Sequence, residues 1–177
     1  FGTDGIRGAM GDYPLDRDSL YRLGLALGEF TRGSRLAIAR DTRQSGREIE
    51  ALLRAGIGGK AQVFSCGVVP TPGLSYITGQ GPFDYGIMIT ASHNPYTDNG
   101  IKLFDKNGEK LPQENERDIE SLFFRSGDRE APPITELPPC PESTGNRGES
   151  VSHALAMYER FLSERGKELP GLRVVLD

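Results

Sequence analysis

Apolar stretches with strand character alternate with helical repeats along this chain, and this alternation constrains the fold more than any other feature. The stretches at residues 36–39 (LAIA), 61–66 (AQVFSC) and 85–90 (YGIMIT) are short and bounded by breakers or polar residues, as in buried strands. Residues 16–33, with leucines at steps of three and four, and residues 45–57 predict two helices. The order predicts an α/β domain with three α/β/α layers and a mixed, largely parallel sheet.

The pattern changes in the last third of the chain. Pro112 suits the first turn of a further helix, whereas residues 126–149 are rich in proline and poor in apolar side chains, which predicts a long covering segment or linker. Residues 150–177 predict one more helix and a final apolar strand, LRVVL, without a partner. Because the chain also opens at Phe1 without a methionine, we expect it to be a fragment.

Composition excludes several classes of function. The chain is 36% hydrophobic and 26% charged, which is typical of a soluble globular protein, and it has no apolar run long enough to span a bilayer. Its net charge of −4 gives no field that favours nucleic acid or an anionic membrane surface. Cys66 and Cys140 lie far apart and there are only two histidines, so we do not expect a zinc site. The compartment that we expect is a reducing cytosol.

The first of three notable loops opens the chain as FGTDGIRG. Its three glycines allow close backbone approach to a ligand and leave N–H groups for an anion. Arg7 would add a forked donor that suits phosphate. The alternative interpretation is a flexible N-terminus or a tight turn.

The second loop, ARDTRQSG, follows the strand at residues 36–39. Ligand sites in open α/β sheets lie at the carboxyl ends of strands, so this position favours a binding role. Arg40 and Arg43 are candidates for anion binding, and the alternative for each is an ion pair with Asp41 or at the surface.

The third loop lies inside GIMITASHNPYTDNGIKLF, between two apolar stretches. A hairpin needs no hydroxyl, imidazole and amine together, yet this loop carries Ser92, His93 and, just beyond it, Lys102. Such a serine can accept a phosphoryl or acyl group when nearby donors stabilise the charge. A polar turn is the alternative, and a serine hydrolase is a second one, although the G-x-S-x-G elbow is absent.

Five segments, GTDGIRG, RDTRQSG, GVVPTPGL, ITASHNP and DNGIK, together resemble the α-D-phosphohexomutase family. The resemblance is strong over residues 1–111 and looser over ALAMYERFLSE. It implies a phosphosugar mutase that interconverts hexose 6-phosphate and 1-phosphate through a phosphoserine and a bisphosphate intermediate. It also implies that residues 1–149 form the first (phosphoserine) domain, with 126–149 as its covering segment. Residues 150–177 would be the truncated start, helix and strand, of a second similar domain.

The resemblance also assigns roles to single residues. Ser92 is expected to be the phosphoserine and, through its phosphate, a ligand of Mg²⁺. Lys102 matches a lysine near the transferring group, a candidate for proton transfer, and Arg7 an arginine that contacts the phosphate. His93 follows the phosphoserine in the family motif and completes the expected catalytic set. The residues expected to bind phosphate or substrate are Thr3, Gly5, Arg43 and Asn94. For Arg43 the resemblance allows a structural role or a phosphate-facing one.

The segments DNGIKLF and GEKL resemble the phosphoglucosamine mutase branch more than the NGFK style of phosphomannomutase/phosphoglucomutase enzymes. Glucosamine phosphate is therefore the expected substrate; the alternatives are another hexose phosphate and a phosphosugar-binding module without catalysis. The full-length enzyme is expected to be cytoplasmic, homodimeric, Mg²⁺-dependent, activated by hexose 1,6-bisphosphate and part of peptidoglycan precursor synthesis. The family's Asp-x-Asp-x-Asp metal loop is absent from this chain, so we expect the chain alone to be inactive.

Overall fold

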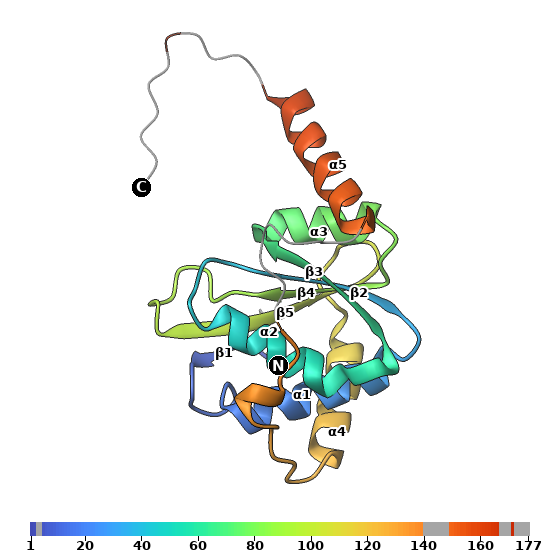
Figure 1. Ribbon diagram of the computed structural model, residues 1–177. Helices are drawn as coiled ribbons and strands as arrows, with labels where there is room; N and C mark the ends of the chain where they lie inside the picture. Colours follow the sequence, from blue (N-terminus) through green and yellow to red (C-terminus); the bar gives the residue numbers. More distant parts are fainter. Residues whose placement is uncertain (3–4, 140–148, 167–170, 172–177) are drawn as a thin grey trace.

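A five-stranded sheet lies between two layers of helices in the computed structural model (Figure 1). The structure describes residues 1–2, 5–139, 149–166 and 171. The strand order across the sheet is β1-β5-β4-β2-β3. The strands are β1 (Ile6–Ala9), β2 (Arg35–Arg40), β3 (Gln62–Val68), β4 (Tyr85–Ile89) and β5 (Asp98–Phe104).

All strands of the sheet except β5 run in one direction. β2 pairs in parallel with both β3 and β4, and β5 is antiparallel to β4 on one side and to β1 on the other. The sheet is therefore mixed and largely parallel, as the sequence predicts. The reversed strand follows β4 through the loop that carries Ser92, so this loop is a hairpin connection and not a crossover.

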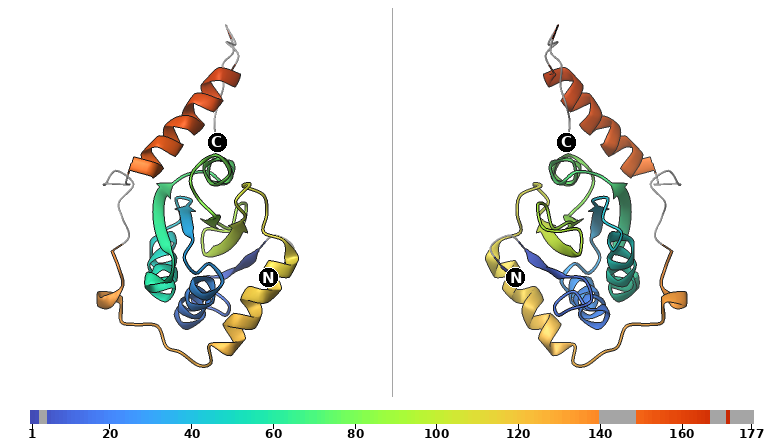
Figure 2. Two further views of the ribbon diagram at one scale, coloured as in Figure 1. Left: turned by 90° about the vertical axis from the view of Figure 1, so that its right-hand side faces the viewer. Right: turned by 90° about the vertical axis from the view of Figure 1, so that its left-hand side faces the viewer.

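Helices cover both faces of the sheet (Figure 2). One face carries α1 (Arg17–Phe30), α2 (Gly46–Ile57) and α4 (Gln113–Arg125). The other carries α3 (Thr71–Gln80) and the amino-terminal part of α5 (Glu149–Arg165). These layers confirm the predicted three-layer α/β/α arrangement.

The strands divide their side chains between two apolar cores, one on each face. In β2, Leu36 and Ile38 are buried among residues of α1 and α2, whereas Ala37 and Ala39 face the core under α3 and α5. This alternation is the period of two expected for a strand that is covered on both faces. The Asp16 side chain caps α1 by accepting a hydrogen bond from the backbone N–H of Ser19 at 2.9 Å, which fixes where that layer begins.

Two edges of the fold differ from the sequence prediction. The glycine-rich opening is predicted as a loop, but residues 6–9 form β1, and β5 begins at Asp98 and not at Ile101. The two differences have one cause, because β1 pairs with these added residues of β5, from Ile6 opposite Ile101 to Ala9 opposite Asp98. A pairing across this sequence separation leaves no local pattern.

Part of the proline-rich segment runs along the outer side of α1 and α2. Asp18 accepts a hydrogen bond from the Ala131 backbone N–H at 2.7 Å, and Arg17 donates to the Pro132 carbonyl at 3.0 Å. Farther on, Arg54 of α2 donates to the carbonyl of Pro139 at 2.9 Å. The predicted domain boundary at residues 149–150 stays a prediction, and the predicted strand LRVVL lies outside the described residues.

None of the helices among the described residues combines the length and apolar character needed to cross a bilayer.

Candidate active site

The second and third loops meet at one edge of the sheet. Because β2 and β4 are parallel neighbours, their carboxyl ends lie side by side, and the Asp41 backbone N–H donates to the Ile89 carbonyl at 3.0 Å. Asp41 and Ser92 each lie just past a strand end. This is the edge at which open α/β sheets bind ligands, so the predicted position of the second loop is confirmed.

Ser92 has an exposed side chain and an unusual backbone. Its φ is +56°, in the left-handed region, and it is the one residue other than glycine with positive φ among those the structure describes. Its N–H donates to Thr90 Oγ1 at 3.0 Å, and Thr90 itself is buried. Residues other than glycine hold such a conformation only where their surroundings enforce it, and such residues cluster at functional sites.

Arg43 holds the Ser92 loop from the neighbouring strand end. Its Nε donates to Asp41 Oδ2 at 3.0 Å, and its other four N–H groups all meet backbone carbonyls of the loop. The accepting carbonyls are those of Ser92 (2.9 Å), Asn94 (2.9 Å), Pro95 and Asp98 (3.0 Å). Every donor of this guanidinium is thus engaged within the protein.

Arg7 and Lys102 lie on the same face of the sheet, around Gly100. Arg7 is opposite Gly100 across the β1–β5 pair, and Lys102 lies two residues farther along β5. Diagonal neighbours of this kind are about 7–8 Å apart, within reach of long side chains. The Thr90 N–H donates to the Gly100 carbonyl at 2.9 Å, so the Ser92 loop starts beside the same glycine.

Gly100 can occupy this crowded position only because it has no side chain. A Cβ there would lie 2.6 Å from the Ile6 carbonyl oxygen, 2.7 Å from that of Thr90 and 3.1 Å from Arg7 Cγ. Gly5 is similar: its φ is +90°, and a Cβ would lie 2.2 Å from the Ile101 carbonyl oxygen. The structure thus brings Gly5, Arg7 and Lys102 together with the start of the Ser92 loop, and Thr3 lies outside the described residues.

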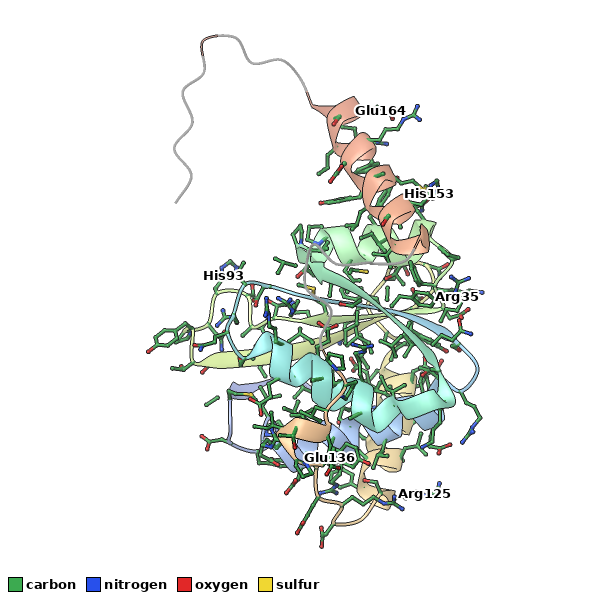
Figure 3. The ribbon with its side chains drawn as sticks, viewed as in Figure 1. Arg35, His93, Arg125, Glu136, His153 and Glu164 are labelled. Carbon is green, nitrogen blue, oxygen red and sulfur yellow. The ribbon has the colours of Figure 1, made fainter. Side chains whose placement is uncertain are left out.

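The remaining expected residues lie on the loop itself. His93 is exposed at the outer side of the loop, far from His153 of α5 (Figure 3). The Asn94 side-chain amide donates to Asp98 Oδ2 at 2.9 Å, so it braces the base of the loop. Asn94 therefore has a visible structural partner, whereas His93 faces outward.

Ser92 and Asn94 border an open groove of about 930 Å³. Its other side is formed by the start of α2, where exposed Arg47 lies, and its rim carries Tyr96, which is 87% exposed. Arg7 lines a different hollow, of about 500 Å³, beside α1 and α4. Arg7 thus borders a second hollow while it also lies beside Gly100, where the Ser92 loop starts.

Arg40 does not take part in the loop. Its side chain is buried with Glu50 of α2, with Nε 3.4 Å from Oε2, so the predicted pairing of Arg40 with Asp41 is wrong. The strand period explains this, since Arg40 and Asp41 point to opposite faces and α2 covers the face of Arg40. The pairing of Arg43 with Asp41 is confirmed, at 3.0 Å.

Sequence reasoning missed Thr90, which links Asp41 to Ser92. Its Oγ1 donates to Asp41 Oδ2 at 2.7 Å while accepting the Ser92 N–H. The available signal was its place two residues before the candidate nucleophile, where a side-chain hydroxyl can reach the backbone.

The described residues do not form a metal site of their own. No group of three or more histidine, cysteine, aspartate or glutamate side chains that could hold a metal ion occurs among them. Asp41 is engaged with Arg43 and Thr90, and Asp98 with Asn94. The described residues therefore do not supply a cluster of three such side chains for a metal ion.

Comparison with known proteins gives a consistent result. Residues 1–130 match the model of phosphoglucomutase/phosphomannomutase, alpha/beta/alpha domain I. A phosphoglucosamine mutase from Solibacter usitatus is 44% identical over 182 residues, which is all of this chain and 39% of that protein. A phosphoglucosamine mutase from Deinococcus deserti is 40% identical over 185 residues, again all of this chain and 39% of the relative. The chain therefore spans about two fifths of the length of these relatives.

Solved structures match about 70% of this chain. A crystal structure of a phosphoglucomutase/phosphomannomutase family protein from Burkholderia thailandensis superposes with a TM-score of 0.60 and 27% identity, over 70% of this chain and 29% of that one. A Thermus thermophilus protein, named as a provisional phosphomannomutase, gives a TM-score of 0.62 and 35% identity over the same shares.

Proposed function

This chain belongs to the phosphoglucomutase/phosphomannomutase family, and from that premise we propose that it is the phosphoryl-carrying part of a phosphosugar mutase, with Ser92 as the residue that carries the phosphoryl group. The observation that carries the proposal is the geometry of Ser92. Its side chain is exposed at the ligand-binding edge of the sheet, while its backbone is held in a left-handed conformation by a network of buried and half-buried partners. A solvated turn needs no such support.

The proposed reaction is the transfer of one phosphoryl group in each direction. A sugar hydroxyl oxygen forms a bond to the phosphorus on Ser92, the bond from phosphorus to Ser92 Oγ breaks, and the sugar leaves with two phosphates. The return step forms the Oγ–phosphorus bond again with the other phosphate of the bisphosphate, and the bond from that phosphorus to the sugar oxygen breaks. In each step one hydroxyl proton is removed and one alkoxide is protonated, which we assign to Lys102.

Two cationic side chains beside the start of the Ser92 loop support this assignment. Phosphoryl transfer depends mainly on positioning and on stabilisation of the charge on the transferred group. Arg7 and Lys102 lie on one face of the sheet beside Gly100. The Gly100 carbonyl accepts the Thr90 N–H, at the start of the Ser92 loop. We assign the phosphate contact to Arg7. His93 faces outward, so we assign it to contacts with groups from other domains of a full-length protein.

The Mg²⁺ dependence known for this family does not enter any step proposed for these residues. A bound Mg²⁺ would supply charge neutralisation on the transferring group, and Ser92 would contact it through the phosphate. Among the described residues, no group of three or more histidine, cysteine, aspartate or glutamate side chains could hold a metal ion. We therefore expect the remaining carboxylate ligands of Mg²⁺ to come from elsewhere in the full-length protein.

The proposed sugar is glucosamine phosphate. The relatives that align over the whole chain at 40–44% identity are phosphoglucosamine mutases. Mannose or glucose phosphate is the alternative within the same family. Because this chain spans 39% of the length of these relatives, the sugar is tested with the full-length protein.

The path of the chain disfavours the hydrolase alternative. A hydrolase serine of the elbow type sits on a strand–turn–helix connection that exposes its hydroxyl above the sheet. Ser92 lies on a strand–loop–strand hairpin between β4 and β5, and its N–H is bonded to Thr90. The base that such chemistry needs would have to be His93, which points outward (Figure 3).

The experiment that tests the proposal is intact-mass measurement with peptide mapping. The full-length protein containing this chain is analysed as purified and after incubation with glucose 1,6-bisphosphate and Mg²⁺, alongside a Ser92→Ala variant. We expect one added phosphoryl group that maps to Ser92 and is absent in the variant. An unmodified Ser92 in a full-length protein that binds the bisphosphate would overturn the proposal and support a binding module without catalysis.

A further inference from the structure

We infer that Thr90, Asp41 and Arg43 form a clamp that holds both the backbone N–H and the backbone carbonyl of Ser92. The clamp so positions the Ser92 hydroxyl for phosphoryl transfer. The role in transfer rests on the proposed function, whereas the clamp itself is a feature of the fold. The three residues come from two strand ends, with Asp41 and Arg43 after β2 and Thr90 after β4.

The hydrogen bonds of the clamp close into a ring that begins and ends at Ser92. The Ser92 N–H donates to Thr90 Oγ1 at 3.0 Å, and the Thr90 hydroxyl donates to Asp41 Oδ2 at 2.7 Å. Arg43 Nε donates to the same oxygen at 3.0 Å, and Arg43 Nη2 donates to the Ser92 carbonyl at 2.9 Å. Each member therefore orients the next, and the two polar backbone groups of Ser92 are both fixed.

Thr90, Arg43 and Asp41 are largely shielded from water, whereas the Ser92 end of the clamp is exposed. The Thr90 residue is 4% exposed, and the side chains of Arg43 and Asp41 are 11% and 26% exposed. Hydrogen bonds to charged groups are stronger than neutral ones, and more so away from water. This is the support that a serine at φ +56° requires.

The bonding of Arg43 assigns it a positioning role. Its five N–H groups are divided among Asp41 and four loop carbonyls, so it acts on Ser92 through the loop and not by contact with a phosphate. The family resemblance leaves a structural and a phosphate-facing role open for Arg43, and this bonding favours the structural one. The forked geometry is essential, because a lysine offers one ammonium in place of five directed donors.

The test uses Thr90→Val, which removes the hydroxyl at nearly unchanged volume, and Thr90→Ser, which keeps it. In the full-length protein, we expect Thr90→Val to slow phosphoryl transfer from glucose 1,6-bisphosphate to Ser92 by about 100-fold, because misplacing a reacting group by about 1 Å costs this much. The KM for the bisphosphate should stay the same, and Thr90→Ser should transfer at the wild-type rate. A raised KM in Thr90→Val, or a Thr90→Ser variant as slow as Thr90→Val, would overturn the positioning role.

Arg43→Lys is the second variant, and Arg54→Lys is its matched control. Arg54 also donates to a backbone carbonyl, that of Pro139, but lies on α2 away from Ser92. We expect Arg43→Lys to slow transfer and Arg54→Lys to leave it unchanged. Equal effects of the two substitutions would overturn the specific role of Arg43.

A second readout separates the clamp from the proposed function. Hydrogen exchange of the Ser92 amide, followed by NMR, reports the bond to Thr90 whether or not the protein transfers phosphate. We expect faster exchange in Thr90→Val than in Thr90→Ser, and equal exchange would overturn the clamp. If the wild-type protein is never phosphorylated, the proposed function and the role in transfer both fail, and faster exchange would still support the clamp as a feature of the fold.

Discussion

Arg40 and Glu50 form an ion pair that is almost completely buried, at 4% and 0% side-chain exposure, with Arg40 Nε 3.4 Å from Glu50 Oε2. The pair joins the end of β2 to the first turns of α2. Neither of these two atoms has a partner within hydrogen-bond geometry, so the attraction is mainly electrostatic. The loop that contains Asp41 and Arg43 lies directly between the two elements that this pair connects.

We expect Glu50→Gln to lower the free energy of unfolding by about 3–5 kcal/mol, because it leaves the Arg40 charge buried without a counter-charge. Urea denaturation followed by circular dichroism measures the change. The double variant Arg40→Met/Glu50→Leu serves as the control, since apolar replacement of a whole buried pair is often neutral or stabilising. A Glu50→Gln protein as stable as the wild type would contradict the assignment.

We expect Gly100→Ala to destabilise the domain by about 1–3 kcal/mol, the usual cost of forcing extra atoms into a packed site. The added Cβ would lie within 3 Å of two carbonyl oxygens, those of Ile6 and Thr90, so β1 and the Ser92 loop must both shift. Gly59→Ala is the matched control, because no atom lies within 4 Å of a Cβ there. Urea denaturation should separate the two variants, and similar midpoints would refute the prediction.

We expect Lys102→Met to slow phosphorylation of Ser92 by roughly 100-fold or more, the usual contribution of a proton-transfer group. Single-turnover mass spectrometry of the full-length protein with glucose 1,6-bisphosphate provides the rate. Lys106→Met, an exposed lysine beyond the other end of β5, is the control and should be unaffected. If Lys102→Met and Lys106→Met slowed phosphorylation equally, the effect would be one of overall charge and not of a specific role of Lys102.

Glu29 provides a pH-dependent prediction away from the site. Hydrogen bonds from Lys60 and Arg32 lower its pKa from 4.5 to about 2. A lowered pKa in the folded state means that the ionised form stabilises the fold above pH 4.5 and that this contribution is lost as the pH falls toward 2. The effect on stability is small because the pair is exposed to solvent.

An NMR titration of the Glu29 side chain tests this directly. We expect a midpoint near 2 in the wild type and a clear rise toward 4.5 in Lys60→Met, since Lys60 Nζ lies 2.8 Å from Glu29 Oε1. Lys106→Met should leave the midpoint where it is. A midpoint that ignores Lys60 would show that the hydrogen bond is not maintained in solution.

The layers of the fold could be predicted from local patterns. Residues 36–39 and 85–90 mark β2 and β4 to within one residue at each end, because both strands are buried on two faces and their central residues are apolar. β1 could not be predicted in this way. Its residues include Gly8 and exposed Arg7, and they become a strand only because β5 offers a free edge.

Several residues of the candidate site could be selected from the sequence, but the hydrogen bonds and ion pairs that join them could not. Ser92 could be selected from sequence because its loop combines a hydroxyl, an imidazole and a nearby amine, and the family resemblance points to both Ser92 and Arg43. The partner of Arg40, by contrast, is set by the face of the sheet that α2 covers, and Glu50 carries no local sign of this. Thr90 escaped notice because a buried threonine at a strand end is ordinary until its hydrogen bonds are seen.

The reversed direction of β5 has a mechanical consequence for a group carried on Ser92. Both ends of the loop continue into strands that are bonded to each other, so the loop cannot swing like a lid without opening the β4–β5 ladder. A group carried there would therefore occupy a nearly constant place in the domain. If the two ends of a sugar are to reach it in turn, the sugar is the body that reorients, and the rest of the protein must permit that rotation without releasing it.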